Sequence, residues 1–310
     1  MRIGIDIGGT KTAAVVLDPG DGVLCAVTHP TGYGPAEVLA TALRCVTELA
    51  EGVGCAPGDF RSIGIGIPGA VNTATGRVDH AVNLGLVGFD LGAELAHRIG
   101  APVRVENDVN AAALGAYRWV RGAETEPGTP GSIAYLNLGT GLAAGIILDG
   151  ELWRGSRGVA GEIGHIPVDP AGALCPCGQR GCLETISSGS GIVRQWPVPD
   201  GESAVRSLMV AATAGNSAAV GVRDGLFVGV ATAIRLLFLS VDVQRVVLGG
   251  GVTTMGEPLL SGVHGVLREW AARSAFLGSL RLDERIQILP DTFPAAAIGA
   301  ALIGENSWQK

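Results

Sequence analysis

The chain is 310 residues long, carries a formal net charge of -7 at pH 7, and is 47% hydrophobic but only 16% charged. This length exceeds the size at which single cores usually stop growing, so we expect two domains. An acidic chain lacks the basic surface that nucleic-acid binding requires, which leaves a small-molecule substrate as the expected partner. The low charged fraction also excludes a disordered chain.

The first residues, "RIGIDIGGTKTAAVVLD" (residues 2–18), predict a β-hairpin whose tip carries two glycines, a threonine and a lysine. A similar phrase returns in "IAYLNLGTGLAAGIILDG" (residues 133–150). Residues 6–18 align without gaps over residues 137–149, and both phrases read as strand, Gly/Thr turn and strand with a closing aspartate. The faint repeat stands where a second domain of like fold would begin.

Helical and strand patterns alternate between and after these hairpins. Helical spacing covers residues 35–52, 88–100, 109–120, 204–222, 224–241 and 294–305, and strand patterns cover residues 62–69, 102–108, 244–252 and 285–290. Alternating strands and helices predict an α/β architecture. The Gly/Pro/Glu-rich stretch over residues 121–132 predicts the hinge region between the halves.

Three glycine-rich turns are candidates for phosphate binding: residues 8–11, residues 139–141 and residues 249–251. Glycine lets backbone N–H groups approach a phosphate, and threonine and lysine add donors. The spacing is not that of a P-loop. From the residues alone, an ordinary hairpin turn stays the alternative for the first tip, and a flexible loop for the third.

Glu106, Asn107 and Asp108 end a predicted strand and open an Ala-rich helix. Asp108 at this place could cap the helix. Ligands of open α/β sheets bind at the carboxyl ends of strands, where a carboxylate can also act as a base. Both interpretations of Asp108 stay open at this point.

The segment "GEIGHIPVDPAGALCPCGQRGCLE" (residues 161–184) holds one histidine and three cysteines: His165, Cys175, Cys177 and Cys182. Three thiolates and an imidazole suit tetrahedral zinc, and four protein ligands would make the zinc structural. In the cytosol a cysteine cluster is more often metal-binding or catalytic than a disulfide framework. The Cys-x-Cys spacing is tighter than that of usual zinc fingers, and buried free thiols beside an unrelated histidine are the alternative. The remaining cysteines, Cys25, Cys45 and Cys55, are expected in the core.

The sequence predicts neither a signal peptide nor a membrane span. Asp6 and several glycines stand where a signal peptide needs an apolar core. The most membrane-like run, residues 226–241, is interrupted by Arg235 and is short for a span, so we expect a buried helix. These features predict a cytoplasmic protein.

Taken together, the motifs resemble those of the ROK family (repressors, open reading frames, kinases). "DIGGTK", "GIPG", "ENDVNAAALGA", "LGTGLAAG", "GEIGH", "CPCGQRGCLE" and "VVLGGGV" follow the family's order and cover nearly the whole chain, from Ile3 to about Gly304. The resemblance implies the actin/hexokinase-like α/β fold, with two ribonuclease-H-like domains and an active-site cleft between them. It implies a smaller N-terminal domain of residues 1–118 plus 294–310, and a larger C-terminal domain of residues 119–293 that carries the zinc loop.

The resemblance also implies an ATP-dependent sugar kinase with Mg²⁺ and structural Zn²⁺. Asp108 matches the general base that takes the proton from a sugar hydroxyl, usually the 6-hydroxyl. The implied cofactor-binding residues are Asp6, Gly9, Thr10, Lys11, Thr140, Gly141 and Gly250. The implied sugar-binding residues are Asn83, Asn107, Asp108, Glu162, His165 and Glu184. The implied zinc ligands are His165, Cys175, Cys177 and Cys182, with the second ring nitrogen of His165 left to face a sugar hydroxyl.

Glucose is the first expected substrate, and N-acetylmannosamine or N-acetylglucosamine is the alternative. Two positions depart from the family pattern: Ala143 replaces a frequent glycine of the second turn, and Phe89 stands where many glucokinases have tryptophan.

Two alternatives come from other functional classes. A sugar-responsive ROK transcriptional repressor is disfavoured, because the first strand starts at Arg2 and leaves no room for a DNA-binding domain. A non-catalytic sugar-binding module would be expected to lose the Asp108-type base or the phosphate turns, and this chain keeps both. Members of the family commonly form homodimers or homotetramers.

Overall fold

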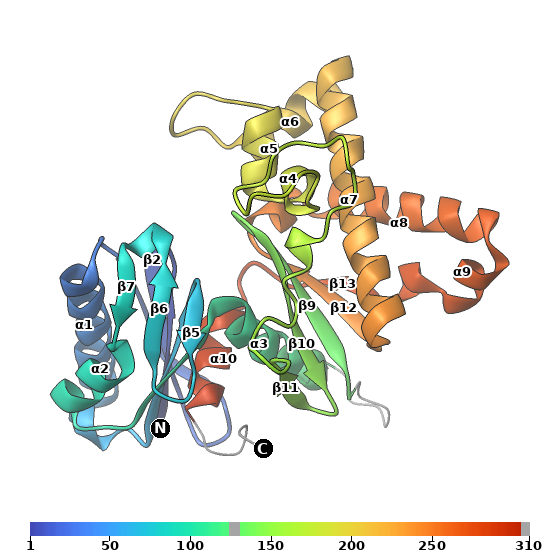
Figure 1. The fold of residues 1–310 in the computed structure, drawn as a ribbon. Helices are drawn as coiled ribbons and strands as arrows, with labels where there is room; N and C mark the ends of the chain where they lie inside the picture. The colour runs from blue at the N-terminus through green and yellow to red at the C-terminus, as the bar shows by residue number, and fades with distance from the viewer. Residues whose placement is uncertain (124–130, 305–310) are drawn as a thin grey trace. The chain divides into compact units, whose positions relative to one another are not determined.

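The computed structural model describes residues 1–123 and 131–304, and its ribbon is drawn in Figure 1. The chain divides into two compact units: residues 1–129, 150–152 and 294–310 form unit 1, and residues 130–149 and 153–293 form unit 2. The predicted hinge over residues 121–132 lies mostly outside the described residues. The predicted domain limits at residues 118 and 293 stay a prediction.

Unit 1 is built on a five-stranded sheet with the order β3-β2-β1-β4-β8. Its strands are β1 (Arg2–Ile7), β2 (Lys11–Leu17), β3 (Val23–Pro30), β4 (Ser62–Ile67) and β8 (Val103–Asn107). β1 runs antiparallel to β2 and parallel to β4, with Ile7 opposite Thr12 at the end of the hairpin. The hairpin predicted over residues 2–18 is therefore confirmed, and its tip is the glycine turn.

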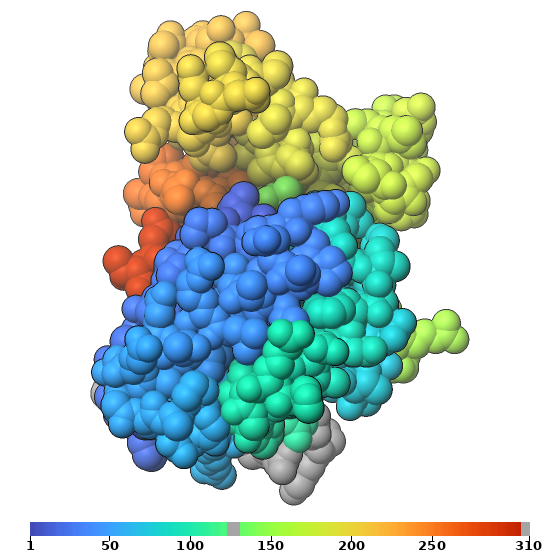
Figure 2. Space-filling view, turned by 90° about the vertical axis from the view of Figure 1, so that its left-hand side faces the viewer, coloured from blue at the N-terminus to red at the C-terminus, as the bar shows by residue number. Residues whose placement is uncertain are grey.

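Helices cover both faces of this sheet, which is why every residue of β4 is buried. α1 (Pro35–Val53) packs on one face, and its outer surface is turned toward the viewer, in blue, in Figure 2. α3 (Asp108–Ala123) and α10 (Ala295–Ile303) pack on the other face. The remaining elements are α2 (Leu91–Ile99), the three-stranded sheet β5 (Ala70–Asn72), β6 (Arg77–Ala81) and β7 (Leu86–Phe89), and the 3-10 turns η1 (Pro57–Asp59) and η2 (Val82–Leu84).

α10 lies unusually close to its neighbours because glycines face it. A Cβ atom on Gly115 of α3 would stand 2.0 Å from the Ala295 carbonyl oxygen, and one on Gly299 would stand 1.7 Å from the Ala111 carbonyl oxygen. The neighbouring atoms belong to the backbone and cannot move aside, so the two helices are in contact through their backbones, with no side chain between them at these glycines. This contact sets the depth at which α3, and Asp108 at its start, lie on the sheet.

We predict that Gly115→Ala lowers the free energy of unfolding by about 1–3 kcal/mol, because the added methyl group overpacks the helix contact. The matched control is Gly122→Ala in the same helix, where nothing lies within 4 Å of the added atom. The control should raise stability by about 0.5–1 kcal/mol through helix propensity alone. Urea denaturation followed by circular dichroism measures both, and equal shifts for the two variants would contradict the close-packing account.

Unit 2 repeats the strand order of unit 1, since its sheet runs β11-β10-β9-β12-β13. The strands are β9 (Ile133–Leu138), β10 (Leu142–Leu148), β11 (Glu151–Trp153), β12 (Arg245–Gly249) and β13 (Ile286–Ile288). β9 is antiparallel to β10 and parallel to β12, as β1 is to β2 and β4. The faint sequence repeat therefore marks two sheets of one topology.

The helical elements of unit 2 are η3 (Ile163–His165), α4 (Glu184–Ser187), α5 (Gly189–Gln195), α6 (Ala204–Thr213), α7 (Ser217–Val241), η4 (Gly251–Met255), α8 (Glu257–Arg273), α9 (Ala275–Leu280) and η5 (Leu282–Arg285). The predicted helix over residues 204–222 is divided, because Gly215 takes a φ of 83° and Asn216 caps α7 by accepting from the Ala219 N–H. The second helix therefore begins at Ser217, earlier than residue 224.

α7 is long and apolar enough to cross a membrane by length and composition, but half of its most apolar window is buried in the protein. Its inner residues join the core of unit 2, where Leu226, Ile234 and Leu237 are at most 1% exposed. The Arg235 guanidinium lies 4.3 Å from the ring centroid of Trp270 in α8. The buried helix expected from the sequence is confirmed.

Candidate active site and metal centre

At the end of β8, Asn107 supplies the main cap of the helix that follows, the role that the sequence had considered for Asp108. The Asn107 Oδ1 atom accepts hydrogen bonds from the backbone N–H groups of Val109 at 2.9 Å and Asn110 at 3.2 Å. Asn107 therefore caps α3, and its Nδ2 donates to the Gly69 carbonyl at 3.3 Å. Asp108 is the first residue of α3, where the helix dipole favours a negative charge. Its Oδ1 also accepts a hydrogen bond from the Val109 N–H at 2.9 Å.

Glu106, for which the sequence indicated no role, holds the start of α3 through hydrogen bonds to Asn107 and Asn110. Its side chain is buried, and Oε1 accepts from the Asn107 N–H and from the Asn110 Nδ2, both at 3.0 Å. A buried carboxylate held by such donors is a fixed support, because leaving those groups unpaired would be costly. The network holds the strand-to-helix junction that presents Asp108.

Asp6, at the end of β1, lies within electrostatic reach of Asp108. Burial and, to a smaller extent, the negative charge of Asp108 together raise the pKa of Asp6 from 3.8 to about 7, against the opposing effect of the Lys11 ammonium group. Two neighbouring carboxylates beside a lysine can share a proton or face a hard cation such as Mg²⁺. This electrostatic pairing was not visible in the sequence, where Asp6 and Asp108 lie far apart.

The first glycine turn closes with a hydrogen bond from the Gly8 N–H to the Lys11 carbonyl at 2.9 Å. Gly9, Thr10 and Lys11 are exposed at its tip. A Cβ atom on Gly9 would lie 3.7 Å from the Cβ of Asn83, so the η2 loop stands beside this tip. Unit 1 thus gathers one part of the predicted set: Asp6, Gly9, Thr10, Lys11, Asn83, Asn107 and Asp108.

The second glycine turn, residues 139–141, contacts the third one. Gly250 takes a φ of 92°, and a Cβ atom there would stand 2.8 Å from the Gly139 nitrogen and 2.7 Å from Asn137 Oδ1. Only glycine fits this approach. Asn137 occupies the place that Asp6 holds in unit 1, and the gap-free repeat was the signal that could have assigned it to the site.

The segment that follows Cys182 holds the second turn in place. The Glu184 Oε2 atom accepts from the Leu142 N–H at 3.0 Å. The Gly189 and Ser190 N–H groups donate to the carbonyls of Gly139 at 2.7 Å and Thr140 at 3.1 Å. Glu184, predicted as a sugar contact, therefore also supports the second glycine turn.

Glu162 and His165 are placed by the contact of η3 with β10. The Ala144 N–H donates to the Gly161 carbonyl at 2.8 Å, and a Cβ atom on Gly161 would stand 1.8 Å from the Ala144 carbonyl oxygen. This contact seats His165 above the same strand end that Glu184 braces. Unit 2 thus gathers the rest of the predicted set: Thr140, Gly141, Glu162, His165, Glu184, Gly250 and the three cysteines.

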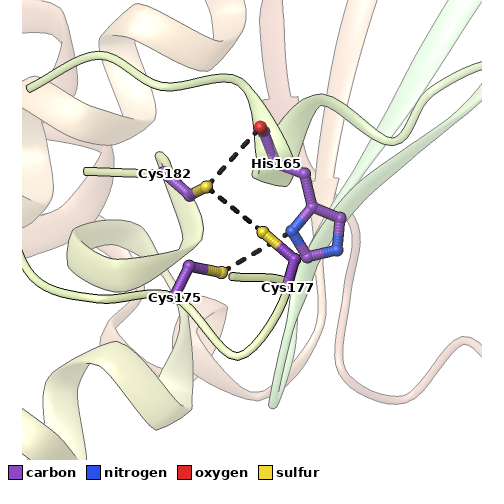
Figure 3. A group of neighbouring side chains, drawn as sticks. All are labelled: His165, Cys175, Cys177 and Cys182. Atoms are coloured by element: carbon purple, nitrogen blue, oxygen red, sulfur yellow. Dashed lines mark hydrogen bonds between the residues drawn. The ribbon is translucent and has the colours of Figure 1, made fainter. Parts of the chain in front are cut away.

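Figure 3 shows that His165, Cys175, Cys177 and Cys182 point toward a common centre. Their ligand atoms all lie within 4.8 Å of one another. The Cys175 Sγ is 3.7 Å from the His165 Nδ1, and the Cys177 Sγ is 3.6 Å from the Cys182 Sγ. The sulfurs are free thiols, too far apart for a disulfide bond of about 2.05 Å.

These separations fit tetrahedral zinc. Four ligands at about 2.0–2.3 Å from an ion lie about 3.5–3.8 Å from one another, which matches the His165–Cys175 and Cys177–Cys182 distances. His165 would use Nδ1, and Figure 3 shows its other ring nitrogen directed away from the sulfurs. The four side chains could therefore hold a structural zinc ion while Nε2 stays free for another partner.

Two of the thiols have pKa values shifted in opposite directions. Hydrogen bonds from the backbone and side chain of Gln179 lower the pKa of Cys177 to about 6. Burial and the neighbouring thiols raise the pKa of Cys182 to about 12. A bound zinc ion would supply the positive charge that keeps all three sulfurs as thiolates.

A cavity of about 420 Å³ lies beyond the third glycine turn. α6 lines one side with Val205, Arg206 and Met209, and the end of η4 lines the other with Thr254 and Met255. The walls are mostly apolar with one cationic side chain, a composition that suits a flat heteroaromatic base.

Two sheets of one strand order, each opening with a hairpin that carries a Gly/Thr turn, define the actin/hexokinase-like class of fold. The ROK family model matches residues 2–303. The chain belongs to the ROK family.

Two relatives by sequence illustrate the range of named activities. The glucokinase of Streptomyces coelicolor is 33% identical over 289 residues, which are 87% of this chain and 88% of that protein. The N-acetylmannosamine kinase of Haemophilus influenzae is 30% identical over 272 residues, which are 86% of each.

Solved structures are similar over nearly the whole chain. The ROK family glucokinase of Streptomyces griseus, in complex with glucose and AMPPNP, superposes with a TM-score of 0.77 at 32% identity, covering 98% of both chains. A ROK family transcriptional regulator, homologous to the Escherichia coli MLC protein, reaches a TM-score of 0.79 at 26% identity, covering 98% of this chain and 77% of the regulator.

We predict that Cys177→Ser lowers the zinc content from about one ion per chain and weakens sugar binding, because a four-ligand structural site tolerates no missing thiolate. Zinc is measured by mass spectrometry of the purified protein, thermal stability by calorimetry, and sugar affinity by titration. Cys55→Ser, a cysteine outside the cluster, is the matched control and should keep full zinc. Normal zinc, stability and sugar affinity in Cys177→Ser would contradict a structural clamp.

We predict that Asp6→Asn makes the stability of the protein less dependent on pH. A carboxyl whose folded pKa is raised to about 7 stabilises the fold while protonated, and this stabilisation is lost as pH rises from about 4 through 7. The free energy of unfolding of the variant, relative to that of the wild type, should therefore increase between pH 5 and pH 8, by at most about 4 kcal/mol. Urea denaturation across this range measures the gain. The exposed Asp90→Asn controls for loss of a carboxylate, and a pH-independent difference for Asp6→Asn would refute the account.

Proposed function

We propose that this chain transfers the γ-phosphoryl group of ATP to the 6-hydroxyl of a hexose, with glucose as the first candidate. The observation that carries the proposal is the position of the carboxylate Asp108: it follows the strand end directly, at the start of α3, and lies within electrostatic reach of Asp6, beside a Gly-Gly-Thr-Lys turn. A base, a cation-binding carboxylate and a phosphate turn are the parts that phosphoryl transfer to an alcohol needs. The relatives named glucokinase, and the glucose and AMPPNP bound to one of them, support the same reaction.

Asp108 acts as the general base. Its carboxylate takes the proton of the sugar hydroxyl as that oxygen attacks the γ-phosphorus and the bond to the leaving ADP oxygen breaks. Mg²⁺ bound with the phosphates would neutralise the charge that develops on their oxygens. Asp6 is the residue of unit 1 that would hold it, since a carboxylate next to Asp108 and Lys11 matches the donor chemistry of that ion.

The nucleotide is assigned to the glycine turns. Gly9, Thr10 and Lys11 offer donors from unit 1, and Thr140, Gly141 and Gly250 offer backbone and hydroxyl donors from unit 2. The cavity beside η4, which begins one residue after Gly250, is the proposed seat of the base, between Met209 and Met255.

The sugar is assigned to side chains that pair with vicinal hydroxyls: Asn83, Asn107, Asp108, Glu162, His165 and Glu184. Carboxylates accept two hydrogen bonds side by side, and an imidazole nitrogen accepts or donates one. Nε2 of His165 is available because Nδ1 faces the cysteines. For Asn107, capping uses the carbonyl oxygen and one amide hydrogen is given to the Gly69 carbonyl, so the second amide hydrogen is the group left for a sugar.

N-acetylmannosamine is the second candidate substrate, because a relative of that name is 30% identical over most of this chain. N-acetylglucosamine kinase activity stays a prediction from the resemblance, as do the cytoplasmic location and a homodimeric or homotetrameric state.

We predict that Asp108→Asn lowers kcat by about 10²–10⁴-fold and changes the sugar KM little, because the amide keeps the shape but cannot take a proton. A coupled assay of ADP release with MgATP measures this on glucose, mannose, fructose, N-acetylmannosamine and N-acetylglucosamine.

Asp90→Asn, an exposed carboxylate of the same unit, is the control and should keep full activity. Turnover on an acetylated sugar alone would keep the mechanism and replace glucose as the substrate. A folded, zinc-loaded wild type that leaves every sugar of the panel unphosphorylated would overturn the proposed reaction, and an active Asp108→Asn would overturn the assigned base.

A further inference from the structure

Thr31 follows β3 directly and is a buried residue that is hydrogen-bonded to the first glycine turn. Its exposed fraction is 0%. The hydroxyl donates to the Gly8 carbonyl at 2.7 Å, and the backbone N–H donates to the Thr10 carbonyl at 3.1 Å. One residue therefore holds two of the carbonyl groups of the turn.

The direction of these bonds is fixed by what surrounds Thr31. A hydroxyl has one proton, and that of Thr31 is given to Gly8, so the buried Thr12 hydroxyl at 2.9 Å must be the donor toward Thr31. Thr41 in α1 donates to the Thr31 carbonyl at 3.1 Å. The hydroxyl chain Thr12, Thr31, Gly8 thus runs in one direction and ends on the turn.

Peptide geometry converts these bonds into an orientation of donors. A trans peptide is planar, so the N–H of Gly9 points opposite to the carbonyl of Gly8. Because that carbonyl is drawn toward buried Thr31, the Gly9 N–H is directed away from the core at an exposed tip. The bond from the Thr31 N–H to the Thr10 carbonyl fixes the peptide that precedes Lys11 in the same way. Glycine has no side chain to hold such a peptide, and without an outside partner it can rotate freely.

We propose that Thr31 is a positioning residue for phosphate binding: it aims the Gly9 and Lys11 backbone N–H groups at the phosphates of the nucleotide. This inference rests on the proposed function, in which the first turn binds ATP. Thr31 does not touch the nucleotide itself. Its effect should therefore fall on the nucleotide and spare the sugar.

The test is Thr31→Val, which keeps the shape and removes the hydroxyl, compared with Thr31→Ser, which keeps the hydroxyl. Thr31→Val should raise the KM for MgATP about tenfold, the loss expected for one hydrogen bond, and leave the sugar KM within about twofold. Thr31→Ser should restore the MgATP KM to within about threefold of the wild type. MgADP affinity by calorimetry should change in parallel with the MgATP KM.

Thr41→Val is the matched structural control, because it removes a hydroxyl bond to Thr31 without touching the turn. It should lower thermal stability as Thr31→Val does, while its MgATP KM stays at the wild-type value. If Thr31→Val does not fold, Thr31→Ala replaces it with the same expected MgATP KM.

An MgATP KM in Thr31→Val equal to that of Thr41→Val would overturn the proposal and leave a purely structural threonine. Equal increases in the MgATP and sugar KM values would do the same. A wild type without sugar kinase activity would instead refute the proposed function, and the role of Thr31 would fall with it. An active wild type with an unaffected Thr31→Val would remove the role of Thr31 alone.

Discussion

A phosphate turn made of glycine needs hydrogen bonds from outside itself, because the residue that lets a backbone approach an anion also leaves that backbone free to rotate. Both units of this chain meet that constraint, and much of their local architecture follows from it. In unit 1 the support comes from the residue after the third strand, through the Thr31 hydroxyl and N–H. The strand order places β3 beside β2 and so brings Thr31 back to the hairpin tip.

In unit 2 a different segment supplies the hydrogen bonds that hold the glycine turn. There the support comes from the residues after Cys182, through the Glu184 carboxylate and the N–H groups of Gly189 and Ser190. Because Glu184 lies two residues after a predicted zinc ligand, the cysteine cluster and the phosphate turn form one connected piece. If the proposed function holds, a metal in that cluster would steady the residues assigned to the sugar and the second glycine turn together.

The sequence allowed the repeated hairpins, the alternation of strands and helices and the buried core helix to be predicted, because each depends on local periodicity. The Cys3His cluster was equally accessible, since its ligands lie within a short loop. What the sequence could not supply were contacts between distant segments: the pairing of Asp6 with Asp108, the closeness of α10 to α3 through Gly115 and Gly299, and the return of Thr31 to the first turn. Such contacts depend on the strand order, which no local pattern determines.

The junction at the end of β8 combines a helix cap and a carboxylate at a strand end within three consecutive residues. A helix start needs a capping oxygen, and a transferase needs an unblocked carboxylate at the same strand end. Here Glu106 anchors the junction, Asn107 caps the helix, and Asp108 takes the first helical position with its dipole-favoured charge. Three consecutive polar residues therefore follow a buried strand because the junction uses each of them, and the proposed function assigns the chemistry to Asp108.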